Sequence, residues 1–211
     1  MKNIFGLSIP QTLEEVCDPQ HVALLVYDMQ VGILNQIKNP EQITLQVLKV
    51  LTAARHAGVR VLFSRHLSLP KELMGMSQFR MAMAWQRTDS PEQVKPWFLR
   101  DDPSFQIIPE LAPRPTEGVF DKLTMSAFEG TWLDFALRDC GINGFIIVGV
   151  ATEIGIEPTI RHGADLGYIP VFVNDACGSG NAEAAQRSIN SIKFIGDALI
   201  TDTETVCLLW K

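Results

Sequence analysis

Apolar runs of strand length alternate along the chain with longer amphipathic stretches. Within the runs the apolar residues are consecutive, a pattern typical of strands that are covered on both faces. The predicted strands are His21–Tyr27, Val59–Ser64, Gly118–Phe120, Gly144–Val150, Ile169–Val173 and Ala198–Ile200.

The amphipathic stretches between these strands are each followed by a glycine, which is common just past the C-terminus of a helix. They are Glu41–Ala57, Thr131–Cys140 and Ala182–Ile195. Strands that alternate with helices predict an α/β fold. We expect a three-layer α/β/α sandwich with a mostly parallel, doubly wound sheet.

One stretch, Leu67–Gly118, breaks this alternation and is rich in proline and methionine. It is far longer than the usual connection between two elements, and Pro70–Arg87 within it has a helix-like pattern. We therefore expect a single domain over residues 1–211, with a partly helical insertion at about 67–118 that covers one edge of the sheet and shapes the pocket.

Composition narrows the class of protein. With 211 residues, 46% of them hydrophobic, the chain can bury a core without disulfides or a structural metal. Its net charge of −6 and scattered basic residues argue against nucleic acid as a partner. The four cysteines lie far apart, and neither a signal-like apolar segment nor a membrane-length one occurs. We expect a cytoplasmic protein with no membrane partner.

Polar residues at the carboxyl ends of parallel strands face the ligand crevice of such a fold. Asp28 directly follows the first strand, His66 lies just beyond the second, and Lys122 follows the third. Taken alone, Asp28 could equally cap the next turn and Lys122 could be an ordinary surface lysine.

The stretch Gly149–Arg161 predicts a sharp turn from strand to helix, with the helix beginning near Thr152. Free backbone N–H groups at such a helix start suit an anion or oxyanion, although Thr152 could simply cap the helix. Gly155 is unusual, because glycine inside a helix costs about 1 kcal/mol relative to alanine. Something in the fold should therefore need the space at this position.

Four motifs occur in order along the chain: Asp28-Met29-Gln30, Lys122 ahead of Ser126-Ala127-Phe128, Gly149-Val150-Ala151-Thr152, and Asn174-Asp175-Ala176. Together they resemble the isochorismatase-like hydrolase superfamily, also called the cysteine hydrolases. The resemblance covers about residues 21–211.

In most of that superfamily an Asp, a Lys and a nucleophilic Cys attack a C–N bond. Asp28 and Lys122 match the first two, whereas Gly155 stands at the cysteine position, so the chain has no thiol nucleophile there. The isochorismatase subgroup also has Gly at this position. Its members cleave a vinyl ether with the Asp as general acid, which implies Asp28, Lys122 and Gly155 as the catalytic set.

The resemblance further implies a set of substrate-binding residues and a non-proline cis peptide between Val150 and Ala151 that turns an amide into the pocket. It implies no metal, no cofactor, a small and anionic substrate, and a homo-oligomer, either a dimer or a tetramer. Without a side chain at Gly155 the pocket should also be roomier. The substrate-binding set is Gln30, His66, Phe128, Val150, Ala151 and Thr152.

The sequence departs from the isochorismatases at Ala151, where they tend to carry Tyr, and at His66, where they tend to carry Gln. Two alternatives therefore stay open beside a cysteine-free hydrolase. The chain could be an amidase-type C–N hydrolase whose cysteine was replaced by Gly155, in nature or by engineering. It could also be a catalytically silent relative that binds a small molecule.

Overall fold

The computed structural model describes all residues, 1–211, and its centre is a six-stranded sheet in which every neighbouring pair is parallel. The strand order is β5-β4-β3-β6-β7-β8. The bounds are β3 Val22–Tyr27, β4 Arg60–His66, β5 Gly118–Lys122, β6 Gly144–Gly149, β7 Ile169–Cys177 and β8 Leu199–Thr201. The predicted α/β class and doubly wound sheet are confirmed.

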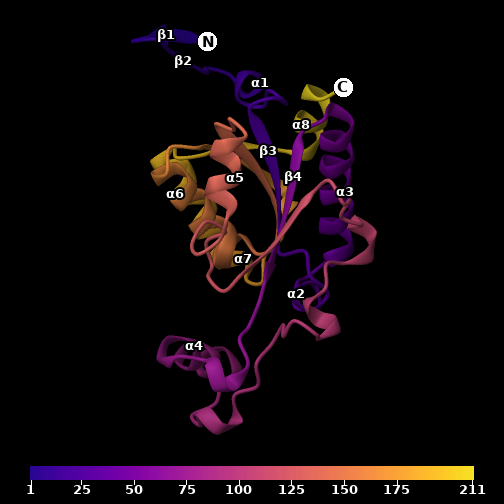
Figure 1. Ribbon diagram of the computed structural model, residues 1–211, viewed down its shortest axis with the longest axis vertical. Helices are drawn as coiled ribbons and strands as arrows, with labels where there is room; N and C mark the ends of the chain where they lie inside the picture. The colour runs from indigo at the N-terminus through magenta and orange to yellow at the C-terminus, as the bar shows by residue number, and fades with distance from the viewer.

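Helices cover both faces of the sheet (Figure 1). One layer consists of α3 (Pro40–Ala57) and α8 (Thr203–Leu209). The other consists of α5 (Leu133–Asp139), α6 (Glu157–Asp165) and α7 (Ala182–Ile195). The left-handed Gly58 and Gly196 end α3 and α7, as the sequence predicts.

Side chains of β3 alternate between the two layers, which explains the unbroken apolar run. Leu24 and Val26 pack in the cluster on the α3 side, whereas Leu25 and Tyr27 pack in the cluster on the α6 side. All six residues of the strand are buried. Tyr27 therefore points toward the layer formed by α5, α6 and α7.

The segment between β4 and β5 corresponds to the expected insertion, and its two parts lie in different places. The first part lies beyond the carboxyl ends of the strands, with α4 (Met76–Gln86) set apart from the body (Figure 1). The last part returns along α3, where Ile108 and Leu111 join the buried cluster on that side of the sheet. No residue of α4 is buried. Its other elements are short 3-10 helices at Lys71–Leu73, Pro91–Gln93, Pro103–Phe105 and Pro109–Leu111.

The N-terminal residues form elements that the hydrophobic pattern does not predict. An antiparallel hairpin of β1 (Lys2–Ile4) and β2 (Leu7–Ile9) precedes the short helix α1 (Leu13–Val16). Every hairpin strand residue is exposed, so burial leaves no periodic signal there. The short α2 (Val31–Leu34) follows β3. None of the helices is long and apolar enough to cross a membrane.

Candidate active site

The strand order places a crevice between β3 and β6. The strands β3, β4 and β5 follow one another toward one edge of the sheet, and β6, β7 and β8 follow one another toward the other edge. Ligands of open α/β sheets bind at such a reversal, outside the carboxyl ends of the strands. Asp28, just after β3, and the turn after β6 both lie at this point.

Asp28 and Lys122 form a buried ion pair at the crevice. The Lys122 Nζ donates to Asp28 Oδ2 at 2.7 Å, and Ser64 Oγ donates to Asp28 Oδ1 at 2.6 Å. Lys122 also donates to the Thr124 carbonyl at 3.1 Å. Asp28 has a φ of 47°, a left-handed conformation in which Asp and Asn are enriched. Three neighbouring strands therefore hold one carboxylate in a fixed orientation.

Burial shapes the protonation of the groups around this pair. It lowers the pKa of Lys122, while the Asp28 carboxylate opposes that change. Burial, with the Lys122 charge second, also lowers the pKa of His66 to about 4, so this imidazole is neutral at pH 7. The Lys122 ammonium lies 4.4 Å above the centre of the Tyr27 ring, which adds a cation–π contact.

Tyr27 occupies the space beside Gly155 that a side chain at this position would need. A Cβ atom at 155 would meet the Tyr27 hydroxyl and lie 2.5 Å from its Cζ. The hydroxyl donates to the Met125 carbonyl, and the ring is buried. Burial raises the pKa of Tyr27 well above its usual value, so it stays protonated. The expectation of a roomier pocket at Gly155 is therefore wrong, because a tyrosine fills the space.

The turn after β6 has an unusual backbone. The peptide between Val150 and Ala151 is cis, which confirms the expectation from the resemblance. Residues Thr152–Ile156 then form a π-helical turn rather than the first turn of an α-helix. The Gly155 N–H donates to the Ala151 carbonyl at 3.0 Å, so it is not free for a ligand, whereas the Ala151 N–H makes no hydrogen bond within the chain.

A cavity of about 280 Å³ opens above Asp28. Its walls come from the ends of β3 and β4, from α2 and the residues after it, from the insertion, and from the segments that follow β5, β6 and β7. The predicted residues Asp28, His66, Val150, Ala151 and Gly155 all line it. The remaining lining residues are Tyr27, Ile33, Gln36, Ile37, Trp85, Trp97, Phe98, Met125, Ile154 and Gly180.

Three residues of the predicted substrate-binding set do not line the cavity. Gln30 is buried, and its amide binds the backbone of His66 and Phe105, which fixes the end of β4 against the insertion. Phe128 stacks on Tyr168 in the core, with ring centroids 5.5 Å apart. The Thr152 hydroxyl donates to the Gly178 carbonyl at 3.0 Å. All three hold the fold around the site.

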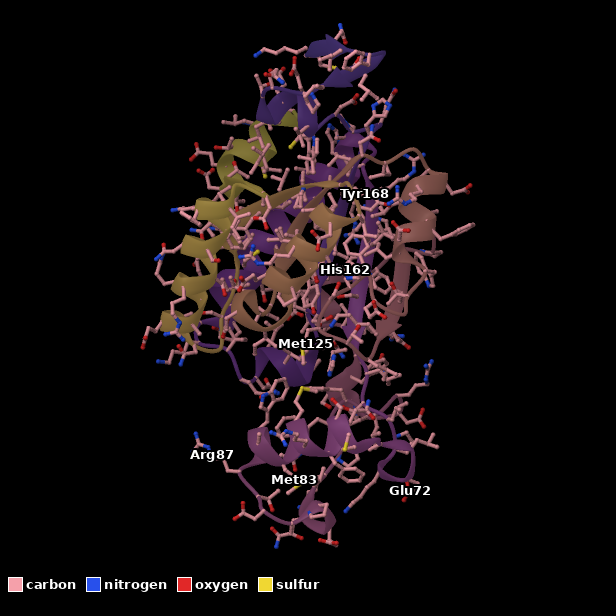
Figure 2. The ribbon with its side chains drawn as sticks, turned by 90° about the vertical axis from the view of Figure 1, so that its left-hand side faces the viewer. Glu72, Met83, Arg87, Met125, His162 and Tyr168 are labelled. Atoms are coloured by element: carbon pink, nitrogen blue, oxygen red, sulfur yellow. The ribbon has the colours of Figure 1, made fainter.

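No arginine lines the cavity, although the sequence offers Arg65 directly before His66. Arg65 pairs with Asp121 at 2.7 Å and covers the Phe105 ring instead. Figure 2 shows Arg87 at one side of the insertion, with its side chain pointing outward, whereas Met125 lies where the insertion meets the body. The walls thus lack the cationic side chains that the expected anionic substrate would need. Nor does any group of three or more His, Cys, Asp and Glu side chains converge to hold a metal ion.

Sequence reasoning missed Tyr27 and the aromatic residues of the insertion. Tyr27 reads as one more apolar residue of a strand, and only the pairing of β3 with β6 brings it near Gly155. Ser64 gave a usable signal, since it ends the predicted run Val59–Ser64, and this run forms β4, which pairs with β3. The tryptophans Trp85 and Trp97 have no periodic pattern that would point to a cavity.

Comparison with known proteins matches residues 22–205 to the Isochorismatase domain family. A cysteine hydrolase from Pseudomonas syringae pv. phaseolicola is 26% identical, with a TM-score of 0.76 over 90% of this chain and 92% of that one. An isochorismatase family protein from Burkholderia thailandensis is 25% identical, with a TM-score of 0.73 over 90% and 96%. The N-carbamoylsarcosine amidase from Thermoplasma acidophilum, 20% identical over 87% and 97%, shares the fold with a TM-score of 0.71.

Proposed function

The chain is a hydrolase of the isochorismatase domain family, and we propose that it cleaves a vinyl ether by proton transfer from Asp28, without a covalent enzyme intermediate. The observation that carries this proposal is the Tyr27 side chain beside Gly155. A tyrosine that stays protonated stands where a nucleophile would have to be, so water must supply the attacking oxygen.

The ion pair provides the proton transfer. The proton starts on the Lys122 ammonium, whose pKa is lowered by burial, and moves along its hydrogen bond to Asp28 Oδ2. Asp28 then gives that proton to the terminal carbon of the enol ether, which leaves Lys122 neutral. Protonation leaves an oxocarbenium ion next to the Asp28 carboxylate, which stabilises the positive charge. Water adds to the carbon of that ion that is bonded to the ether oxygen, and it returns a proton to the neutral Lys122. The hemiketal then collapses to a carbonyl compound and an alcohol.

Two other groups support this geometry. Ser64 donates to Oδ1 and so leaves the Asp28 carboxyl a single orientation toward the cavity. The Ala151 N–H, which has no partner within the chain, can donate to the oxygen of the hemiketal as it forms. Neither contribution needs a thiol. The half-buried Cys177, whose pKa is raised well above its usual value by desolvation, donates weakly to the Ile147 carbonyl and is not among the residues that line the cavity.

The alternative of an amidase that has merely lost its cysteine fits the structure less well. Replacing Gly155 by Cys would force the Cβ into the Tyr27 ring, so the thiol cannot return while Tyr27 keeps its place. An amidase origin therefore requires two coordinated changes, at positions 27 and 155.

The test uses phenyl vinyl ether, which hydrolyses to phenol and acetaldehyde, with acetanilide as the matched C–N substrate. In D2O the acetaldehyde should carry one deuterium in its methyl group, since protonation at carbon precedes water addition. Asp28→Asn should lower the rate by about 10² or more. Release of aniline from acetanilide, or equal rates for wild type and Asp28→Asn, would overturn the proposal.

A further inference from the structure

The cavity above Asp28 has walls that are mainly aromatic and aliphatic. Trp97 and Phe98 meet edge to face with ring centroids 6.4 Å apart, and the His66 ring lies edge to face with Phe98 at 6.1 Å. Ile33 and Ile37 add aliphatic side chains to the lining. Such walls favour a flat apolar group, because aromatic rings bind partners by offset or edge contacts.

Two of the aromatic side chains are exposed although they line this cavity. Trp85 retains 46% of its accessible surface and Trp97 retains 37%. Both belong to the insertion, and Trp85 lies on α4, a helix that buries none of its residues. Packing of the fold therefore does not account for these indoles, whereas a ligand in the cavity would cover them.

Charge in the cavity is balanced before any ligand enters. Asp28 is the only acidic residue in the lining, and its carboxylate is matched by the Lys122 ammonium at 2.7 Å. Lys122 itself is buried behind Asp28. His66 adds no charge at pH 7. A charged ligand of either sign would thus leave water without gaining a free counter-charge, which is costly in an apolar site.

We propose that the substrate is uncharged and carries an aromatic or otherwise flat apolar group, an inference that rests on the proposed function. This group binds against Trp85 and Trp97, and the reactive bond lies at Asp28. The cavity volume of about 280 Å³ limits the substrate to a small molecule, since ligand pockets usually span about 300–1,000 Å³. The insertion is then the element that selects the substrate.

The experiment compares two probes that differ by one carboxylate, phenyl vinyl ether and 2-phenoxyacrylate. Their affinities are measured on the wild type, which keeps the Asp28–Lys122 pair, by quenching of tryptophan fluorescence in the first milliseconds after mixing, before turnover. Phenyl vinyl ether should bind at least tenfold more tightly, and its affinity should change little between low and high salt. Tighter binding of 2-phenoxyacrylate, or no measurable binding of phenyl vinyl ether, would overturn the inference.

Variants of single tryptophans locate the binding group. Trp85→Leu and Trp97→Leu, each made in the otherwise wild-type chain, should weaken the binding of phenyl vinyl ether about fivefold to tenfold. Trp132→Leu is the matched control, because Trp132 is equally exposed but packs on Phe120, away from the cavity. Equal effects at all three positions would overturn the assignment. Tight binding without phenol release by the wild type would instead refute the vinyl ether chemistry and leave the substrate class standing.

Discussion

A single methyl group added at position 155 should destabilise this protein, although the same change stabilises an ordinary helix. Replacing a helical glycine by alanine usually gains about 1 kcal/mol. Here the added Cβ would lie 2.5 Å from the Tyr27 Cζ and closer still to its hydroxyl. Tyr27 is buried and cannot swing into solvent. Overpacking of a core costs about 1–3 kcal/mol, so we expect Gly155→Ala to lower the free energy of unfolding by about that much.

The assay is urea unfolding followed by circular dichroism, supported by the thermal midpoint. A loss of about 1–3 kcal/mol should lower the midpoint by several degrees, given roughly 2–4 °C per kcal/mol at this chain length. Gly75→Ala is the matched control. Gly75 has no atom within 4 Å of its potential Cβ and does not have a positive φ, so the change there should stay below about 1 kcal/mol.

Tyr27 links this result to the site. If the tyrosine is the obstacle, Gly155→Ala should cost less in a Tyr27→Leu background than in the wild type, with a coupling of about 1 kcal/mol or more. A Gly155→Ala protein as stable as the wild type, or more stable, would show that the space beside Gly155 is not filled. The argument against a simply lost cysteine would then fail with it.

Three further results are expected. Lys122→Met should lower the free energy of unfolding by about 3–5 kcal/mol in a urea titration, because it leaves the buried Asp28 carboxylate unpaired. Iodoacetamide should alkylate the exposed Cys140, as intact mass would show, without loss of activity, since no thiol takes part; inactivation in step with labelling would refute this. Stability should fall as the pH drops from about 6.5 to about 4, because the pKa of His66 is lower in the folded chain than in the unfolded one and the unfolded chain binds the proton first. His66→Gln should flatten that slope in urea unfolding at pH 7 and pH 5.

The sheet could be read from the sequence because burial on both faces leaves long apolar runs. The predicted His21–Tyr27 differs from β3 by one residue. The run Ile169–Val173 predicts only part of β7, which continues to Cys177 through the polar Asn174 and Asp175. There the Asp175 carboxylate accepts two hydrogen bonds from Thr203 at the start of α8, a tertiary contact without a periodic signal.

The candidate site was predictable where chemistry follows directly from a strand end. Asp28 and Lys122 are residues of this type, because parallel strands bring their carboxyl ends to the same edge of the sheet. Tyr27 and the aromatic lining were not, since they depend on side-chain packing between segments about one hundred residues apart. Gly155 lies between the two cases: its cost in a helix predicts a need for space, but only the packing identifies Tyr27 as the side chain that uses it.

The reversal of strand order at β3 also has a consequence for how the chain acquires its activity. Asp28 and Lys122 are 94 residues apart, and the Tyr27 hydroxyl reaches Met125 across 98. The cavity is then completed by residues 150–155, from the half of the sheet that is synthesised last. Contacts of such long sequence separation form late, because the chain between them must first be closed into a loop. During refolding, the circular dichroism signal of the helices should therefore recover before catalytic activity does. The time at which activity returns then reports when β6 docks against β3.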